Sequence, residues 1–432
     1  MRKVFLILSL LVLIASIYFL SYEVSQDNFA AIILAFSTAF LSYFLAYKYN
    51  NQLQFKNWVL LFLIINFIPL LAPANLSPDV YRFIWDGDII LQGINPFEYT
   101  PSDLINVEKF QWTERLKTVY ENGITDLSKQ NFSVYPTVNQ LYFVIASYLT
   151  DTVDQFYIVL RLLILCTHIL GGIFLIKLLD YFSIPRIKSL LVALNPLLII
   201  ELTGNFHFEG VMVSFLLIAI YFLVKLKLFK SSLFWAISVN VKLSPLLLLP
   251  FVLKFLGLKK SIKFYFLTIS FSLLIIALSV WPSIMHHFLK SVKLYFGTFE
   301  FNSSFFKWSV LLCSEFYEGN FIEKLGPIFS YLNFGVLLLL ALFVKVKNAK
   351  QMFTLMTFGY VTYLFLSTTV HPWYITIPLV LSVFTNKNFV FIWSFLIVLS
   401  YASYDSAMES YASFLSALSY VILFVFLLLE RR

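Results

Sequence analysis

Apolar runs of bilayer-spanning length recur along the whole chain, and they constrain its fold more than any other feature. A transmembrane α-helix needs roughly 17–25 mainly apolar residues. We expect such spans at roughly 4–22, 29–47, 57–73, 156–179, 188–203, 209–224, 261–281, 326–344, 351–368, 373–386, 388–402 and 412–429. Only 12% of the residues are charged, about half the share of a soluble domain. The sequence therefore predicts an all-α polytopic membrane protein: a single integral-membrane domain, residues 1–432, with about 12–14 transmembrane helices.

The basic residues predict the orientation of the spans. Cytoplasmic loops of membrane proteins carry an excess of Lys and Arg. The basic residues that fall on one side of the expected spans are Arg2, Lys3, Lys48, Lys56, Arg186, Lys188, Lys225, Lys227, Lys230, Lys254, Lys259, Lys260, Lys263, Lys345, Lys347, Lys350, Lys387, Arg431 and Arg432. We therefore place both termini in the cytoplasm and the protein in the inner (cytoplasmic) membrane. The loops 74–155 and 282–325 then lie on the periplasmic or extracellular side. The net charge of +8 follows this topology, so it does not indicate a nucleic-acid partner.

One segment, residues 231–254, breaks the alternation because basic clusters flank both of its ends. A single helix cannot return to the side from which it started, and Lys242 and Pro245 interrupt the middle of the segment. We therefore expect a broken hairpin of two short helices. Such irregular backbone is tolerated at membrane depth where it lines protein or a cavity. The two cysteines, Cys166 and Cys313, are far apart in the sequence and do not indicate a disulfide.

The stretch "SPDVYRFIWDGDIILQGINPFEYTPSD" (77–103) is polar and rich in proline, although it directly follows the third expected span. Pro78 and the spacing of the apolar residues predict a short interfacial helix beginning near Asp79. Tyr81 and Trp85 would then lie at the level of the lipid headgroups. Asp86 follows Asp79 by about two helical turns, on roughly the same face. A carboxylate at a bilayer surface suits a general base acting on a hydroxyl group, although an aspartate at this position is also a common helix cap.

Five further segments follow in order: "VYPTVNQLYF" (134–143), "NPLLIIELTGNFHFEGVMVSFLLIAIYF" (195–222), "VKLSPLLLLP" (241–250), "FEFNSSFF" (299–306) and "HPWY" (371–374). Together with the stretch 77–103, they resemble the motifs of integral-membrane glycosyltransferases of the GT-C fold. The similarity is greatest to bacterial polyprenyl-phosphate-mannose-dependent mannosyltransferases, and it covers about residues 75–375. One departure is Thr137, which stands where the family has a second proline.

The resemblance implies a reaction and its partners. Such enzymes move a sugar, most often mannose, from a polyprenyl-phosphate donor to an acceptor hydroxyl on the outer face, with inversion. The acceptor is a glycolipid, a lipid-linked glycan or a protein, and the product belongs to a cell-envelope glycan. The family's catalytic carboxylate lies in the first outside loop, which carries over to Asp79 as the general base. Asp86 remains the second choice.

Other polar residues complete the candidate site. A leaving phosphate requires cations, and Arg82, Lys242 and His371 are candidates for binding it. The candidates for binding substrate are Asp88, Asn95, Tyr135, Gln140, Asn205, His207, Glu209, Trp373 and Tyr374. No cluster of residues indicates a metal site, and a lipid-linked donor needs no divalent ion for a diphosphate. We therefore expect neither a metal nor a cofactor.

A transporter or a flippase for a lipid-linked glycan is the alternative function. Such proteins place ionisable residues near the membrane midplane in discontinuous helices, as the 231–254 segment suggests. Two observations favour the enzyme. The two halves of the chain show no internal repeat, and the carboxylates crowd into one outside loop.

Overall fold

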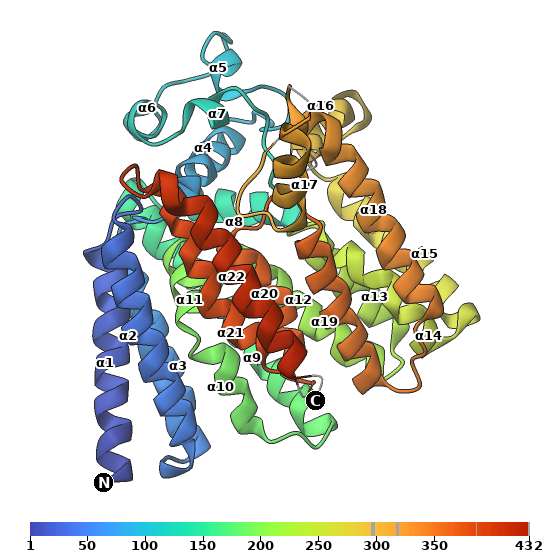
Figure 1. Cartoon of the computed structure of the whole chain (residues 1–432). Coiled ribbons are helices and arrows are strands. Elements are labelled where there is room, and N and C mark those ends of the chain that lie inside the picture. Colours follow the sequence, from blue (N-terminus) through green and yellow to red (C-terminus); the bar gives the residue numbers. More distant parts are fainter. Residues whose placement is uncertain (295–298, 317–318, 386, 431–432) are drawn as a thin grey trace.

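The computed structural model describes residues 1–294, 299–316, 319–385 and 387–430. Over these residues the chain forms 22 α-helices, joined by short helical turns and loops. The one β-type pairing among them is an isolated bridge between Phe301 and Thr369. Long helices lie side by side in a bundle, and shorter ones form a cap over the end away from the N-terminus (Figure 1). The expected all-α fold is confirmed.

The bundle contains the apolar helices of the chain. They are α1 (Arg2–Tyr22), α2 (Phe29–Lys48), α3 (Phe55–Phe67), α9 (Val153–Tyr181), α10 (Leu190–Ala193), α11 (Pro196–Leu198), α12 (Glu209–Val224), α13 (Leu228–Val239), α14 (Leu253–Leu256), α15 (Leu258–Ile276), α18 (Phe321–Phe343), α19 (Ala349–Phe365), α20 (Thr376–Ser382), α21 (Phe389–Leu396) and α22 (Glu409–Leu429). Within the described ranges, five helices (α1, α2, α9, α18 and α22) are individually long and apolar enough to cross a bilayer. A sixth candidate is a bent pair, and several apolar helices are shorter. The chain is therefore a polytopic membrane protein.

The expected straight span at 188–203 is broken, which corrects the sequence-based expectation. Residues Arg186–Ala193 and Pro196–Gly204 form two helical pieces that meet at an angle of 54°. Pro196 has no N–H group to continue the first helix. The Asn195 side chain instead accepts hydrogen bonds from the first amides of the second piece. That piece ends in a π-helical segment, η4 (Ile199–Gly204), a form often found at functional sites.

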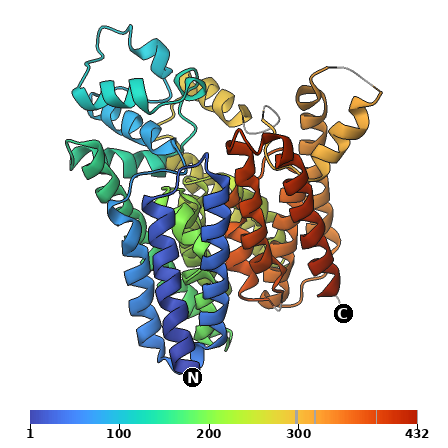
Figure 2. The same cartoon turned by 60° about the vertical axis from the view of Figure 1, so that its left-hand side comes forward.

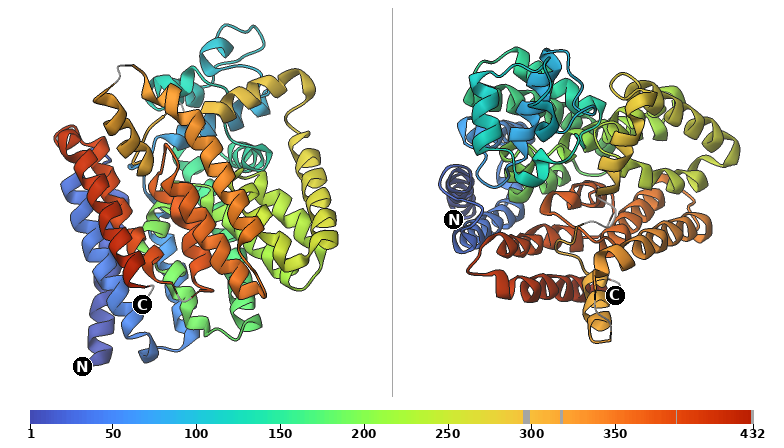
Figure 3. Two further views of the ribbon diagram at one scale, coloured as in Figure 1. Left: turned by 45° about the vertical axis from the view of Figure 1, so that its right-hand side comes forward. Right: turned by 90° about the horizontal axis from the view of Figure 1, so that it is seen from above.

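The cap over the bundle, here called the layer, is built from residues 74–155. It contains α4 (Asp79–Leu91), α5 (Pro101–Leu104), α6 (Glu114–Asn122), α7 (Asp126–Lys129) and α8 (Thr137–Tyr148). Seen from above, the layer covers only one side of the bundle (Figures 2 and 3). Helix α4 begins at Asp79 as expected, but most of it is enclosed between α6 and α8. An added Cβ at Gly87 would lie 2.6 Å from the Phe143 carbonyl oxygen, so only glycine permits this close packing of α4 on α8.

Trp85 corrects a second expectation. Its side chain is only 1% exposed, so it cannot lie among lipid headgroups. It packs against three aromatic rings of the layer, those of Phe110, Trp112 and Tyr120, with ring centroids 5.5 to 6.2 Å away. Burying aromatic rings in this way supplies much of the apolar core that a thin polar layer needs. Trp85 therefore stabilises the layer from within.

The second predicted loop, 282–325, packs beside the layer. It contains α16 (Met285–Leu294) and α17 (Phe305–Ser314), while residues 295–298 and 317–318 lie outside the described part. The Phe97 ring of the layer contacts Phe288 of α16, with centroids 5.7 Å apart. Further along, Phe301 pairs with the segment 368–370: its amide donates to the Thr368 carbonyl, and its carbonyl accepts from Val370. This loop is therefore attached both to the layer and to the segment that precedes α20.

The 231–254 segment forms two helical pieces on either side of a turn. Helix α13 ends at Val239, and a 3-10 segment, η5 (Ser244–Val252), leads into α14. Lys242 lies in the turn between them. The Trp235 indole N–H donates to the Pro245 carbonyl at 3.2 Å, which ties the two pieces together. Both cysteines are free thiols. Arg431 and Arg432 are outside the described residues.

Candidate active site

Below the layer, four aromatic rings from three distant segments stack on one another. His207 lies on one face of Trp373, with centroids 3.4 Å apart, and His371 lies on the other, at 4.6 Å. Phe301 stacks on the far side of His371, also at 4.6 Å. We call these four side chains the ring stack. It joins the turn after η4, the segment before α20 and the loop before α17, which the sequence could not show to be neighbours.

Glu201 lies at one end of the ring stack and is completely buried. The Tyr401 hydroxyl donates a hydrogen bond to one of its carboxylate oxygens. The other oxygen is 3.3 Å from Nε2 of His207 and accepts from Asn205 at 3.4 Å. Nε2 of His207 is buried and has no hydrogen-bond partner among the described residues, so it faces Glu201 without bonding to it. Sequence reasoning did not single out Glu201, although an ionisable residue inside an apolar run is a recognised signal of function.

Lys242 and Glu209 form an ion pair beside the ring stack. The Lys242 ammonium group also lies 4.9 Å from the centre of the Tyr374 ring. About a third of the Lys242 side chain remains exposed, whereas Glu209 is almost fully buried. The second carboxylate oxygen of Glu209 has no hydrogen-bond partner among the described residues. The pair therefore presents one accessible positive charge next to an incompletely satisfied carboxylate.

His371 is held in its neutral form. Burial lowers the pKa of His371 to about 3, and the nearby His207 and Lys242 act in the same direction. Its Nδ1 atom is buried and has no hydrogen-bond partner in the described part of the chain. A buried polar atom without a partner is unusual in a folded protein. This nitrogen is therefore available to a bound ligand.

Asp79 lies at the N-terminus of α4, where the layer meets the bundle. Its backbone amide donates to the Ser77 hydroxyl, and the side chain is half-buried. No described residue bonds to its carboxylate. Tyr404 lies within electrostatic range of both Asp79 and Glu201, and its ring is 5.3 Å from Phe301 of the ring stack. Asp79 is thus an open carboxylate close to the ring stack.

Asp86 is in the opposite situation. One of its oxygens bonds to Nε of Arg82 at 2.6 Å, and the other accepts from Ser133 at 2.5 Å and Gln140 at 3.0 Å. Arg82 also donates from Nη1 to two backbone carbonyl groups, each at 2.9 Å. A rise of about 1.5 Å per residue separates Asp79 and Asp86 by roughly 10 Å along α4. The two carboxylates therefore do not share one reaction centre.

The remaining predicted residues of the layer are also engaged by other groups of the protein. Asp88 forms a two-point pair with Arg115, a partner that sequence reasoning missed. The Asn95 side chain donates to the Ser279 carbonyl at 2.6 Å and accepts from the Phe97 amide. The Tyr135 ring packs edge-on against Phe83, with centroids 4.7 Å apart. The residues brought together at the ring stack are instead Asn205, His207, Glu209, Lys242, His371, Trp373 and Tyr374.

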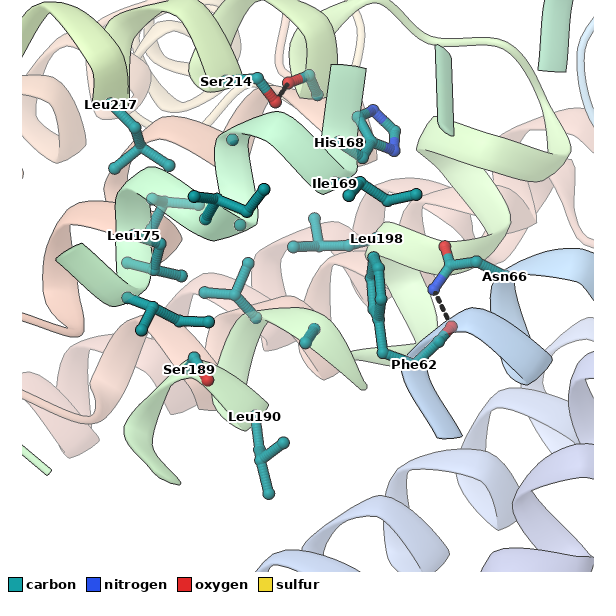
Figure 4. A pocket seen from close by; sticks show the side chains of 18 of the residues that line it. Phe62, Asn66, His168, Ile169, Leu175, Ser189, Leu190, Leu198, Ser214 and Leu217 are labelled. Atoms are coloured by element: carbon teal, nitrogen blue, oxygen red, sulfur yellow. Dashed lines mark hydrogen bonds between the residues drawn. The ribbon is translucent and has the colours of Figure 1, made fainter. Parts of the chain in front are cut away.

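An apolar cavity of about 290 Å³ lies in the bundle beside this site (Figure 4). Its walls come from α3, α9, α10, η4, α12 and α20. Leu202 and Gly210 belong to its lining and directly follow Glu201 and Glu209 in the chain. The cavity continues along α3 as far as Phe55, near the end of that helix that is remote from the layer. Polar groups are sparse in it; Asn66, His168 and Ser214 are among them.

A metal site is not evident in the described ranges, because no three His, Cys, Asp or Glu side chains gather there closely enough to hold an ion. The ionisable groups at the ring stack instead pair with one another. The arrangement can accept a proton at Asp79 and can hold an anion at Lys242. It can also accommodate a hydrocarbon chain in the cavity.

Comparison with known proteins identifies one family. The family model described as alpha-(1→6)-mannopyranosyltransferase, N-terminal domain (MptA_B family), matches residues 9–257. This match contains the layer, η4, the Lys242–Glu209 pair and most of the cavity lining. None of the curated proteins and none of the solved structures matches the chain.

Proposed function

The chain belongs to the alpha-(1→6)-mannopyranosyltransferase family, and we propose that it transfers mannose from a polyprenyl-phosphate donor to a hydroxyl group of a glycan acceptor. The enzyme class follows from the family. The donor, the stereochemistry, the base and the side of the membrane are our proposals. We place the site on the periplasmic or extracellular side, because the positive charges of the chain gather at the other ends of the helices.

The observation that carries the proposal is the neighbourhood of an open carboxylate, an accessible lysine and an apolar cavity. A polyprenyl-phosphate sugar has three parts: a hydrocarbon chain, a phosphate and a sugar. The cavity suits the chain because its walls are almost entirely apolar. Lys242, at the edge of the ring stack, suits the phosphate. The space next to Asp79 is then left for the sugar and the acceptor.

We assign Asp79 as the general base. It takes the proton from the acceptor hydroxyl while that oxygen forms a bond to the anomeric carbon of the mannosyl group. The bond from the anomeric carbon to the phosphate oxygen breaks on the opposite face, and polyprenyl phosphate leaves with the bonding electrons. The family is described by an α-(1→6) linkage. A single displacement that yields an α-linkage requires a β-linked mannosyl phosphate as donor and a 6-hydroxyl group as acceptor.

Lys242 is our assignment for the group that stabilises the leaving phosphate. A preorganised cation aimed at developing negative charge is among the largest contributions to catalysis. In this structure Lys242 is paired with Glu209, so the phosphate would compete with that carboxylate. His371, neutral and with an unpartnered nitrogen, can add a hydrogen bond. Arg82 is the weaker candidate, because its Nε and Nη1 atoms already bond within the layer.

The sugar is proposed to bind against the ring stack. Trp373 offers an aromatic surface, although its two faces are largely covered by His207 and His371. Glu209 has a free oxygen and Asn205 an amide, and both suit hydrogen bonds to sugar hydroxyl groups. Asp88, Tyr135 and Gln140 are assigned to holding the layer together, since each has partners there. Asn95 is assigned to tying the layer to the turn after α15, through the Ser279 carbonyl.

The deciding experiment is mannosyl transfer by the purified protein in detergent or liposomes. The donor is a short-chain polyprenyl-phosphate mannose, the acceptor is a total lipid extract, and EDTA is present. Wild type is compared with Asp79→Asn and with Asp126→Asn, an exposed aspartate of the same layer that pairs with Lys129 at the surface. We expect a loss of about 10²–10⁴-fold in Asp79→Asn and no change in Asp126→Asn.

Two other outcomes would contradict the proposal. Transfer that survives in Asp79→Asn but disappears in a folded Asp86→Asn variant would move the base to Asp86. Failure of wild type with every prenyl-phosphate sugar, together with movement of a lipid-linked glycan across the bilayer, would establish the flippase instead.

A further inference from the structure

Arg161 of α9 is a completely buried cation that the proposed mechanism leaves unused. All five N–H groups of its guanidinium donate to backbone carbonyl oxygens. Those carbonyl groups belong to Leu70, Ala72, Pro73, Thr203 and Gly204. The N···O distances include 2.7 Å to Gly204 and 3.2 Å to Leu70. We call this arrangement the carbonyl cage.

The cage contains no counter-ion. Arg161 has no ion pair among the described residues, and its nearest charge-stabilising neighbours are the rings of Phe206, at 4.3 Å, and Tyr157, at 5.8 Å. A buried charge without an opposite charge is normally replaced by an apolar residue, because removing it from water is unfavourable. Ionisable residues in membrane-spanning segments are accordingly rare and are associated with function. The reason for an arginine here therefore lies in the backbone carbonyl groups that it holds.

One of the two segments held by the cage leads to the proposed base, and the other carries part of the ring stack, against which the sugar is proposed to bind. The carbonyl groups of residues 70–73 belong to the turn that leads to Asp79, six residues further on. The carbonyl groups of Thr203 and Gly204 lie between Glu201 and His207. These segments are far apart in the sequence, and a single rigid side chain bonds to both. Together with the hydrogen bond from the Thr203 hydroxyl to Asn66, this guanidinium links the segment that leads to Asp79 with the segment that carries Glu201 and His207.

The turn after the cage shows how closely this backbone is constrained. Phe206 has a φ of 63°, a left-handed conformation that non-glycine residues seldom adopt. Its ring covers the Arg161 guanidinium, and its backbone turns the chain so that His207 meets Trp373. Without the cage, the backbone of the strained turn at Phe206 and the segment 70–79, which ends at Asp79, would be less well fixed.

We propose that Arg161 is the positioning residue that sets the distance between Asp79 and the Glu201–His207 pair. The proposal rests on the function proposed above. Only arginine presents five donors in one planar fork. Lysine, with three donors on a point charge, can satisfy at most part of the cage. The charge would be kept in Arg161→Lys, and the geometry would be lost.

The kinetic test compares Arg161→Lys with Arg186→Lys. Arg186 is a matched control because it also makes a two-point bond, to Asp180, but is half exposed and remote from the layer. We expect kcat per folded molecule to fall roughly 10- to 100-fold in Arg161→Lys, with little change in the KM for the donor, because small misplacements of reacting groups have effects of this size. Arg186→Lys should keep the wild-type kcat. An unchanged kcat in a folded Arg161→Lys variant would overturn the proposal.

A second measurement needs no substrate and separates this proposal from the proposed function. Amide hydrogen exchange is followed in wild type and in Arg161→Lys. We expect faster exchange in 74–79 and 203–207, with α1 and α2 unchanged. Equal exchange in both segments would refute the role of the cage. If wild type transfers no mannose but the exchange result is as expected, the proposed function is wrong, and the positioning role of Arg161 is still supported. Should Arg161→Lys not fold, Arg161→Gln is measured in the same way.

Discussion

The carboxylates of the layer and those at the ring stack differ in how fully their hydrogen-bonding capacity is used. In the layer, Asp86 accepts from Arg82, Ser133 and Gln140, and Asp88 is held by Arg115. Near the ring stack, Glu209 keeps a free oxygen, and Asp79, at the edge of the layer, bonds to no described residue, whereas Glu201 is held by Tyr401 and Asn205. A buried polar group that keeps unused capacity is unfavourable unless a ligand or water uses it. The comparison therefore separates aspartates that build the protein from those available to substrate.

The same comparison applies to the cations. Arg82 and Arg115 are almost fully buried, each against a carboxylate of the layer. Lys242 also has a carboxylate partner, but it remains about one-third exposed and carries a single point charge. An exposed and flexible cation can change partners when an anion arrives, whereas a buried ion pair that is held by further hydrogen bonds cannot. Three predictions test this distinction between groups bonded within the protein and groups available to a ligand, beginning with the largest expected effect.

The largest effect is expected from Asp86→Ala, which leaves the buried Arg82 without its carboxylate. Removing one partner of a buried ion pair typically lowers the free energy of unfolding by about 3–5 kcal/mol. We expect a greatly reduced yield of folded protein and a lower thermal midpoint in detergent. Asp126→Ala, an exposed aspartate of the layer, is the matched control and should change the midpoint little. A folded and thermally normal Asp86→Ala variant that has lost transfer would place Asp86 with the catalytic groups instead.

The distinction between bonded and available groups also explains which parts of the site could be predicted from the sequence. The apolar runs give most of the helices, because bilayer thickness fixes their length. The helix start at Asp79 follows from the local signal of Pro78. Whether an aspartate is satisfied depends instead on distant partners, such as Ser133 for Asp86 and Arg115 for Asp88. No local pattern contains that information.

Glu201 is a second residue whose role could not be predicted from its neighbours in the sequence. Its neighbours in the chain are apolar, so it is visible only as one acidic residue inside a hydrophobic run. Its partner Tyr401 comes from a helix some 200 residues later. The break at Asn195–Pro196 could have been anticipated from the proline, whereas the π-helical segment that follows could not. The sequence pattern thus predicts the helices and their breaks, whereas the role of a residue such as Glu201 depends on contacts with distant parts of the chain.

The second prediction concerns the apolar cavity, which is proposed to be available to the prenyl chain of the donor. Gly172 of α9 lines it, and an added Cβ there meets nothing within 4 Å. Gly172→Trp should therefore fold normally and fill part of the space. If the prenyl chain occupies the cavity, the KM for a long-chain donor should rise about tenfold, equivalent to about 1.4 kcal/mol. The rise should be smaller for a donor with a short chain.

The matched control for this substitution is Gly335→Trp on α18. An added Cβ at Gly335 is equally free of contacts, but Gly335 is remote from the cavity lining. Its KM should equal that of wild type for both donors. Equal KM values for the long-chain donor in all three proteins would show that the chain binds elsewhere.

The smallest effect concerns His371, a buried group of the ring stack that titrates differently in the folded and unfolded states. The folded pKa of about 3 lies below the ordinary value of about 6.5. Between these two values the unfolded chain binds a proton that the folded protein does not. The free energy of unfolding should therefore fall as the pH falls through this window, by at most about 1.4 kcal/mol per pH unit. Above pH 6.5 the histidine is neutral in both states and the dependence ends.

His371→Gln removes this titration and keeps a polar side chain in the ring stack. Between pH 7 and pH 6 this titration changes the free energy of unfolding by less than about 1 kcal/mol. The thermal midpoint of the variant should therefore vary less over this range than that of wild type, measured in the same detergent. His286, whose ring lies 4.0 Å from that of His287 in the second loop, provides the control substitution, and His286→Gln should keep the wild-type dependence. A variant whose midpoint falls with pH as steeply as that of wild type would mean that His371 is not the group kept neutral by burial. The His371 ring assigned to the donor phosphate would then carry a positive charge. His371 could no longer be counted among the neutral groups that are available to a ligand.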